Sequence, residues 1–248
     1  MRPCQPPERG SEPPGDLLEA GGRDSSFLYA MPAGFFALMK TGKGNWNFES
    51  EPQPGLGGRR MYFPRGKVLG GSSAINGMVV SRGNQGDYDQ WAALGNAGWS
   101  YDQLLPYFKR LEDFPAGDPK YRGRSGPISI SMPALATMNP TSRAWIEVGI
   151  QAGHPFNKDV NEVSPLGVAQ MQGNYAKGER HSASARYLRP VLNRPNLTVI
   201  TGALATRVLL EGSKAVGIEY RKGGHLHTLR ATREVILSGG VINSVQVL

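Results

Sequence analysis

A glycine- and serine-rich turn carries the strongest chemical signal in the chain. It lies within residues 65–82 (RGKVLGGSSAINGMVVSR), where an apolar pair runs into Gly70-Gly71 and then Ser72-Ser73. Two adjacent glycines leave backbone N–H groups uncovered, and a serine here can cap a helix whose N-terminus attracts an anion. A diphosphate is held in this way, although a Gly-Gly-Ser-Ser sequence alone is more often only a turn before a helix.

The same segment matches neither of two other glycine motifs. A Walker A loop needs a glycine five residues before its Gly-Lys pair, but Met61 stands there and Val68 follows Lys67. The segment contains no Gly-x-Ser-x-Gly, so it is not the nucleophile turn of a hydrolase. By spacing alone it predicts a generic anion-binding turn.

Two further glycine pairs follow apolar stretches, at Gly21-Gly22 and at Gly239-Gly240. Glycine pairs after strands mark places where a cofactor and the backbone come close. Glu19 stands just before the first pair, and an acid at a strand end is where dinucleotide-binding folds hold a ribose hydroxyl. An acid in that place is, however, more often simply solvated.

The elements that position these residues are both helices and strands. Apolar periodicity predicts helices over residues 87–95, 100–112, 141–152 and 182–192, with a kink or boundary at Pro106 and a cap at Asn139 or Thr141. Alternation predicts strands over residues 127–132, 197–201, 206–211, 214–221, 225–230 and 233–238, with a two-residue hairpin turn at Gly223-Gly224. We expect an α/β fold that ends in an antiparallel meander.

Composition limits the classes of function. The chain has 248 residues, a formal charge of 28 − 20 = +8 and a single cysteine, Cys4. One thiol forms neither an internal disulfide nor a multi-cysteine zinc site, which favours a reducing compartment, and we expect a cytoplasmic location. The basic residues are scattered, so we expect no nucleic-acid partner. The apolar stretch over residues 27–39 is too short to span a bilayer, and membrane association stays open.

Taken together, these segments resemble the GMC (glucose–methanol–choline) flavin oxidoreductases over about residues 16–248, and most closely their choline dehydrogenase and alcohol dehydrogenase branch. The most specific stretch is 59–83, which looks like the first signature of the family. The other stretches that carry the resemblance are 17–24 (LLEAGGRD), 45–54 (NWNFESEPQP), 87–112, 184–212, 215–220 (AVGIEY) and 233–248 (REVILSGGVINSVQVL).

The resemblance implies FAD as the cofactor and assigns residues to it. Glu19 matches the acid that holds the adenosine ribose, and Val208 matches the valine whose backbone meets the adenine. The loop along the diphosphate and isoalloxazine corresponds to Gly71, Ser72, Asn76, Gly77, Met78 and Val79. Ile75 stands where some relatives carry a histidine joined covalently to the flavin, so we expect non-covalent FAD.

The sequence also departs from the family pattern. No Gly-x-Gly-x-x-Gly precedes Glu19, nothing resembles the catalytic histidine of the family, and Val245 replaces a usual proline. We therefore expect a truncated chain without catalytic residues: an incomplete Rossmann-like FAD-binding domain (17–115 and 185–248), interleaved with part of an α+β substrate domain (120–184), after a disordered leader (1–16).

For the full-length parent, the resemblance implies oxidation of a primary alcohol (choline-like, aliphatic or aromatic) to the aldehyde, with hydride transfer to flavin and an unknown electron acceptor. The alternative is a catalytically incompetent fragment, at most a weak nucleotide-binding module; for the chain alone we expect poor solubility, little bound flavin and no turnover. We expect no metal site, since His225 and His227 are two ligands at most. The four tryptophans are expected in the core or at a domain interface.

Overall fold

The computed structural model describes residues 15–248, which form two compact units. Unit 1 contains residues 15–26, 38–75 and 188–248, and unit 2 contains residues 27–37 and 76–187. Each unit is thus assembled from segments that are far apart in the sequence. Most of the expected leader, residues 1–14, lies outside the described residues, whereas Gly15 and Asp16 belong to the first strand.

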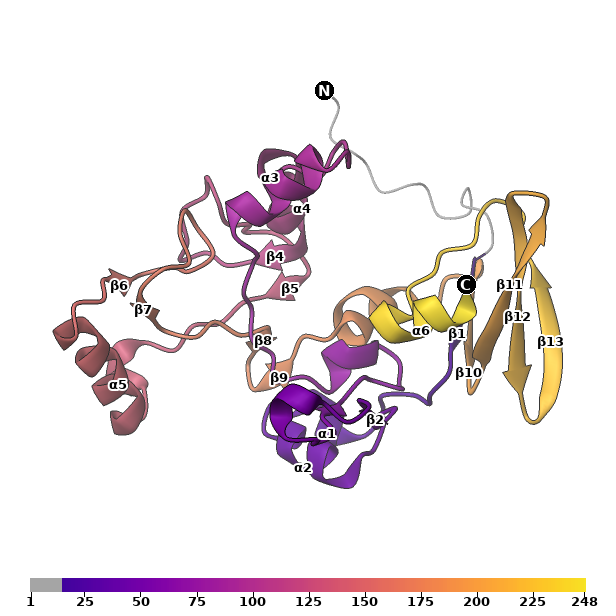
Figure 1. Ribbon diagram of the computed structural model, residues 1–248, viewed down its shortest axis with the longest axis horizontal. Helices are drawn as coiled ribbons and strands as arrows, with labels where there is room; N and C mark the ends of the chain where they lie inside the picture. The colour runs from indigo at the N-terminus through magenta and orange to yellow at the C-terminus, as the bar shows by residue number, and fades with distance from the viewer. Residues whose placement is uncertain (1–14) are drawn as a thin grey trace. The chain divides into compact units, whose positions relative to one another are not determined.

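Unit 1 is built mainly from strands. A parallel pair, β1 with β10, lies beside an antiparallel sheet in the order β11-β12-β13 (Figure 1). A short antiparallel pair, β2 with β3, and the helix α6 complete the unit. The bounds are β1 Gly15–Glu19, β2 Phe48–Glu49, β3 Tyr62–Phe63, β10 Leu197–Thr201, β11 Leu204–Glu211, β12 Lys214–Lys222, β13 His225–Arg230 and α6 Gly240–Val247.

The sequence explains the main turns of unit 1. Gly223 and Gly224 join β12 to β13 with φ of 57° and 83°, so the expected two-residue hairpin is confirmed. β1 and β10 pair in parallel, with Leu17 opposite Val199. In the sequence, 177 residues lie between the end of β1 at Glu19 and the start of β10 at Leu197. A parallel pair of this kind needs a long crossover connection, which unit 2 and part of unit 1 provide.

Unit 2 combines helices with short strand pairs. Its hydrogen-bonded pairs are β4 with β5, β6 with β7, and β8 with β9. The helix α2 (Gly34–Thr41) runs from residues of unit 2 into residues of unit 1. The bounds are α1 Phe27–Ala30, α3 Gln85–Ala93, α4 Tyr101–Leu111, β4 Glu112–Asp113, β5 Ile128–Ser129, α5 Pro140–Gln151, β6 Phe156–Asn157, β7 Val168–Ala169, β8 Tyr175–Ala176 and β9 Glu179–Arg180.

Local capping explains where the helices of unit 2 begin. Ser100 and Gln103 form a capping box at the start of α4, and Asn139 accepts the N–H of Thr141 at the start of α5. The predicted helices over residues 100–112 and 141–152 are therefore confirmed within two residues. Pro106 lies inside α4, so it does not mark a helix boundary, and the other expectation, a kink, stays a prediction.

Three local predictions do not hold. Residues 233–238 are not a strand, because no strand among the described residues pairs with them. The segment 182–192 forms a π-helical turn, Ser184–Leu188, and a 3-10 turn, Arg189–Val191, in place of one regular helix. Of the expected strand 127–132, only Ile128–Ser129 forms a strand, while Ser131 makes an isolated antiparallel bridge with Gly173.

The apolar interior is small in both units. In unit 1, Leu38, Val68 and Ile75 are almost completely buried. Of the tryptophans expected in the core or at an interface, Trp145 is 76% exposed, so in unit 2 it is not a core residue. Across residues 15–248, we find no helix long and apolar enough to cross a bilayer.

Candidate functional site

The carboxylate of Glu19 closes the turn that follows β1. The N–H of Gly21 donates to Glu19 Oε1 at 2.7 Å. Burial raises the pKa of Glu19, while that hydrogen bond and the positive charge of Lys67 act in the opposite direction. Glu19 therefore stands at the strand end, partly buried, as a hydrogen-bond acceptor of the kind that a ribose hydroxyl needs.

The Glu19 turn lies directly against the predicted anion-binding segment in unit 1. The N–H of Leu69 donates to the carbonyl of Gly22 at 3.0 Å. A Cβ on Gly21 would lie 1.8 Å from the carbonyl oxygen of Lys67, so only glycine permits this approach. The structure thus brings together two glycine segments that are about 50 residues apart in the sequence.

The turn at Gly70-Gly71 has a different form from the one expected. Both glycines have positive φ, 88° and 53°, and they lead into a short 3-10 turn, Gly71–Ala74. The serines do not cap a helix: Ser72 Oγ accepts the N–H of Gly66 at 3.1 Å, and Ser73 Oγ donates to the carbonyl of Gly70 at 2.6 Å. Their hydroxyls instead hold the shape of the turn.

Val208 lies in β11, opposite Ile218 of β12, and is partly buried. The chain enters β11 next to the Glu19 turn, because the N–H of Ala203 donates to the carbonyl of Glu19 at 2.9 Å. Unit 1 therefore contains four of the predicted cofactor residues: Glu19, Gly71, Ser72 and Val208.

The other four predicted cofactor residues form a tight loop in unit 2. Met78 is a non-glycine residue with φ of 62°, a conformation that costs about 1–3 kcal/mol. Asn76 Oδ1 accepts the N–H of Met78 at 3.1 Å, and the N–H of Asn174 donates to the carbonyl of Met78 at 3.0 Å. Asn76, Gly77 and Val79 are exposed, whereas Met78 is buried.

Within each unit taken by itself, these residues fit part of a dinucleotide such as FAD. No atom lies within 4 Å of the position that a Cβ would take on Gly71 or on Gly77, so the backbone is open to close approach at both. Glu19 stands at the end of a parallel strand, the place at which dinucleotide-binding folds hold a ribose hydroxyl. Ile75 is buried and has no nucleophilic group with which to form a covalent link.

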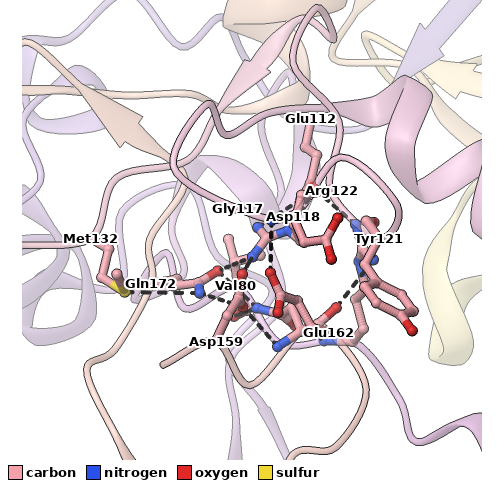
Figure 2. A network of polar contacts seen from close by, with 12 residues as sticks. Val80, Glu112, Gly117, Asp118, Tyr121, Arg122, Met132, Asp159, Glu162 and Gln172 are labelled. Atoms are coloured by element: carbon pink, nitrogen blue, oxygen red, sulfur yellow. Dashed lines mark hydrogen bonds and ion pairs between the residues drawn. The ribbon is translucent and has the colours of Figure 1, made fainter. Parts of the chain in front are cut away.

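A buried cluster of charges lies in unit 2 (Figure 2). The fully buried Arg122 donates to both carboxylate oxygens of Glu112, at 2.7 and 3.0 Å, and to Asp159 Oδ2 at 2.5 Å. It also donates to Gln172 Oε1 at 2.9 Å. Burial alone lowers the pKa of Arg122, but the two carboxylates raise it above its usual value.

The same cluster holds the backbone that follows the Asn76–Val79 loop. Arg82 Nη2 donates to Glu112 Oε1 at 2.8 Å, while the N–H of Arg82 donates to Asn161 Oδ1 at 2.6 Å. Asn161 Nδ2 donates to the carbonyl of Val80 at 3.1 Å, and the N–H of Val80 donates to the carbonyl of Gln172 at 3.0 Å. Residues 80–82 are therefore fixed on several sides.

His181 is a buried residue to which the sequence assigned no role. Its Nδ1 accepts the backbone N–H of Ser129 at 3.0 Å. Burial and the charge of Arg186 lower the pKa of His181, so the ring is neutral at pH 7. Among residues 15–248, no group of three His, Cys, Asp or Glu side chains is arranged to hold a metal ion.

A parallel strand pair that ends in a carboxylate beside a glycine-lined turn is the arrangement of a dinucleotide-binding protein. Residues 16–248 match the N-terminal domain of the GMC oxidoreductases, and the chain belongs to this family. The expected family is therefore confirmed.

Similar proteins agree with this assignment. The chain is 44% identical over 232 residues to oxygen-dependent choline dehydrogenase of Vibrio vulnificus, covering 94% of this chain and 41% of that protein. It is 43% identical over 235 residues to mitochondrial choline dehydrogenase of Homo sapiens, covering 95% and 39%. The chain thus spans about two fifths of the length of these relatives.

Solved structures confirm the α/β flavoprotein fold. The crystal structure of pyridoxine 4-oxidase from Mesorbium loti matches with a TM-score of 0.82 at 32% identity, covering 88% of this chain and 43% of that one. An FAD-dependent oxidoreductase from Chaetomium thermophilum matches with a TM-score of 0.79 at 30% identity, covering 89% and 40%.

Proposed function

We propose that this chain supplies FAD-binding residues to an oxidoreductase that oxidises a primary alcohol to the aldehyde. The observation that carries the proposal is the contact in unit 1 between the Glu19 turn and the segment that leads to Gly71. The Glu19 carboxylate and the open backbone of Gly71 therefore belong to one unit, which supports Glu19 as the acceptor for a ribose hydroxyl. Membership of the GMC oxidoreductase family and the FAD-dependent neighbour support the choice of FAD.

The proposed substrate is a small alcohol of choline-like, aliphatic or aromatic type. The similar proteins named choline dehydrogenase and pyridoxine 4-oxidase support this class. Bound FAD would accept the hydride from the carbinol carbon, and the hydroxyl proton would pass to a base, which balances the two-electron oxidation. The roles proposed for this chain are to hold the ribose at Glu19 and to leave the backbone open at Gly71 and Gly77.

We further propose that FAD is bound without a covalent link, since Ile75 offers no nucleophile. Acid precipitation of the flavin-loaded protein tests this point. Yellow colour in the supernatant is the expected result, and colour that stays in the pellet contradicts it.

The domain assignment is part of the same proposal: residues 17–115 and 185–248 contribute to the FAD-binding domain, and residues 120–184 contribute to the substrate domain. We also propose the cytoplasm as the location. Fractionation of cells that produce the protein at its natural level, followed by immunodetection, tests the location.

The decisive experiment is a titration of the purified chain with FAD, followed by flavin fluorescence. We expect Gly71→Val to weaken binding at least tenfold, because a side chain would fill the open space at that backbone. Gly58→Val is the matched control, since Gly58 also has positive φ and open space but lies outside the proposed site. Equal affinities for the two variants contradict the proposed site.

Activity is measured separately, in a full-length parent that contains this chain, as reduction of an artificial electron acceptor in the presence of choline or of aliphatic or aromatic alcohols. Alcohol-dependent reduction by the flavin-loaded protein supports the proposed oxidation. Weak FAD binding with no reduction by any of these alcohols favours the alternative, a catalytically incompetent fragment that is at most a weak nucleotide-binding module.

A further inference from the structure

Arg180 is a buried arginine that points at the predicted flavin loop from a distant part of the chain. It ends β9, is 2% exposed and belongs to unit 2 together with the loop. Its Nη1 donates to the backbone carbonyl of Asn76 at 2.6 Å and to Asn76 Oδ1 at 2.8 Å. One guanidinium nitrogen therefore holds both the backbone and the side chain of a residue that lies 104 positions earlier.

The contact with Asn76 matters because Asn76 shapes the next two residues. Its Oδ1 accepts the N–H of Met78 at the same time as it accepts from Arg180. This double use fixes the side chain of Asn76 in the rotamer that supports the left-handed backbone of Met78. Without Arg180, Asn76 Oδ1 would be held by one backbone N–H alone, and the side chain would be free to rotate into solvent.

The β8–β9 hairpin contacts the loop at a second point. The N–H of Asn174, which directly precedes β8, donates to the carbonyl of Met78 at 3.0 Å. Tyr175 and Arg180 are paired across the hairpin, so the contacts made by Asn174 and by Arg180 come from the same pair of strands. The hairpin thus clamps the loop at Asn76 and at Met78, with Gly77 exposed between them.

We propose that Arg180 is a positioning residue for the flavin loop: it holds Asn76 so that the backbone of Gly77 and Met78 is presented in a single conformation. The side chain acts through Asn76 and has no assigned contact with the flavin. The consequence for binding rests on the proposed function, whereas the consequence for the loop conformation does not.

A charge at this position is not sufficient for the role. A guanidinium carries its donors in a fixed planar fork, while an ammonium is a compact charge on a flexible stem. Arg180→Lys is therefore expected to keep the positive charge and to lose part of the hold on Asn76. Burial lowers the pKa of Arg180, but an arginine stays protonated across the working pH range.

Hydrogen exchange of the flavin-free chain tests the proposal without any enzymatic activity. We expect Arg180→Met to accelerate exchange of the Met78 and Asn174 amides at least tenfold, with Arg180→Lys in between. Amides of α5, in the same unit, should keep their wild-type rates. The matched control is Arg186→Met, because Arg186 also donates to a backbone carbonyl, that of Pro127 at 2.6 Å, away from the loop.

A double-mutant cycle with Asn76→Ala distinguishes positioning from general support of the fold. We expect the double variant to exchange at Met78 no faster than Asn76→Ala alone, because Asn76→Ala already removes the amide oxygen through which Arg180 acts on the Met78 N–H. Additive effects, an unchanged rate at Met78, or equal acceleration throughout α5 would overturn the proposal. If Arg180→Met does not fold, the comparison of Arg180→Lys with Asn76→Ala decides in the same way.

FAD affinity provides the second readout. We expect the dissociation constant for FAD to rise at least tenfold in Arg180→Met and to stay unchanged in Arg186→Met. If the wild-type chain binds no FAD, the proposed function fails, but the exchange rates at Met78 still decide whether Arg180 positions the loop. If FAD binds equally well to both variants, Arg180 does not position the loop for the flavin.

Discussion

Replacement of Arg122 by methionine should destabilise the protein strongly. The guanidinium of Arg122 is fully buried and makes four hydrogen bonds, to Glu112, Asp159 and Gln172. Methionine has a similar length but no charge and no donor. The change leaves two buried carboxylates with only Arg82 as a positive partner, since Arg82 contacts Glu112 and not Asp159.

The expected magnitude follows from what remains around Asp159. Its carboxylate keeps hydrogen bonds from Gln172 Nε2 and from the N–H of Asn161, at 2.7 and 2.9 Å, but loses its ion pair. Removing one partner of a buried ion pair costs about 3–5 kcal/mol, because the remaining charge is uncompensated. For a chain of this size, each kcal/mol lowers Tm by about 2–4 °C, so we expect a fall of about 6–20 °C.

Thermal and urea unfolding of the purified variants measure this effect. Arg230→Met is the matched control, because Arg230 makes an ion pair with Glu211 at 2.6 Å in which both side chains are exposed. An exposed pair contributes about 0–1 kcal/mol. Adding Asp159→Asn to Arg122→Met removes the uncompensated charge and should restore part of the loss. If Arg122→Met costs no more than Arg230→Met, the argument from burial is refuted.

Three further predictions concern other parts of the structure. The lowered pKa of His181 means that the unfolded chain binds a proton more readily, so stability should fall as the pH drops below about 6.5, and His181→Asn should flatten this dependence in unfolding measured from pH 5 to 8. The raised pKa of Glu19 means that its carboxylate is lost at a higher pH than usual, so FAD affinity should begin to weaken above the ordinary carboxyl value of 4.5 as the pH falls, and Glu19→Gln should remove the pH dependence in a fluorescence titration. Gly21→Ala should cost about 1–3 kcal/mol or more in urea unfolding through its clash with Lys67, whereas Gly22→Ala, with open space at its Cβ, should cost less; equal losses would contradict the packing argument.

Features that depend on neighbours in the sequence were predictable. The hairpin at Gly223-Gly224, the capping of α4 at Ser100 and the cap of α5 at Asn139 all follow from local residue types. The prediction of a strand over residues 233–238 was wrong. Its apolar alternation indicates a strand, but a strand also needs a pairing partner, which the local sequence does not reveal.

In the candidate site, too, features set by local sequence were predictable and features set by distant residues were not. The sequence and its family resemblance identified Glu19 and Gly71, and the structure brings their two segments together. Whether these residues bind FAD stays a prediction. Arg122 and Arg180 were missed because a single arginine has no sequence pattern that distinguishes a buried position from a solvated one. Their burial becomes visible only when distant carboxylates and carbonyls are brought next to them.

The two parts of the predicted flavin loop are held by different kinds of contact. The turn at Gly71 is fixed by hydroxyls of Ser72 and Ser73 that bond within six residues. The Asn76 part is fixed by Arg180, 104 residues away, and the backbone beyond it by Asn161, 79 residues from Arg82. Long-range contacts of this kind form only when unit 2 is assembled around its buried charges, so the conformation of Asn76 and its neighbours depends on the whole interior of that unit. If FAD binds as proposed, a substitution deep in unit 2 that contacts none of the predicted cofactor residues will therefore alter FAD affinity, whereas the Gly71 turn keeps its shape through its own neighbours.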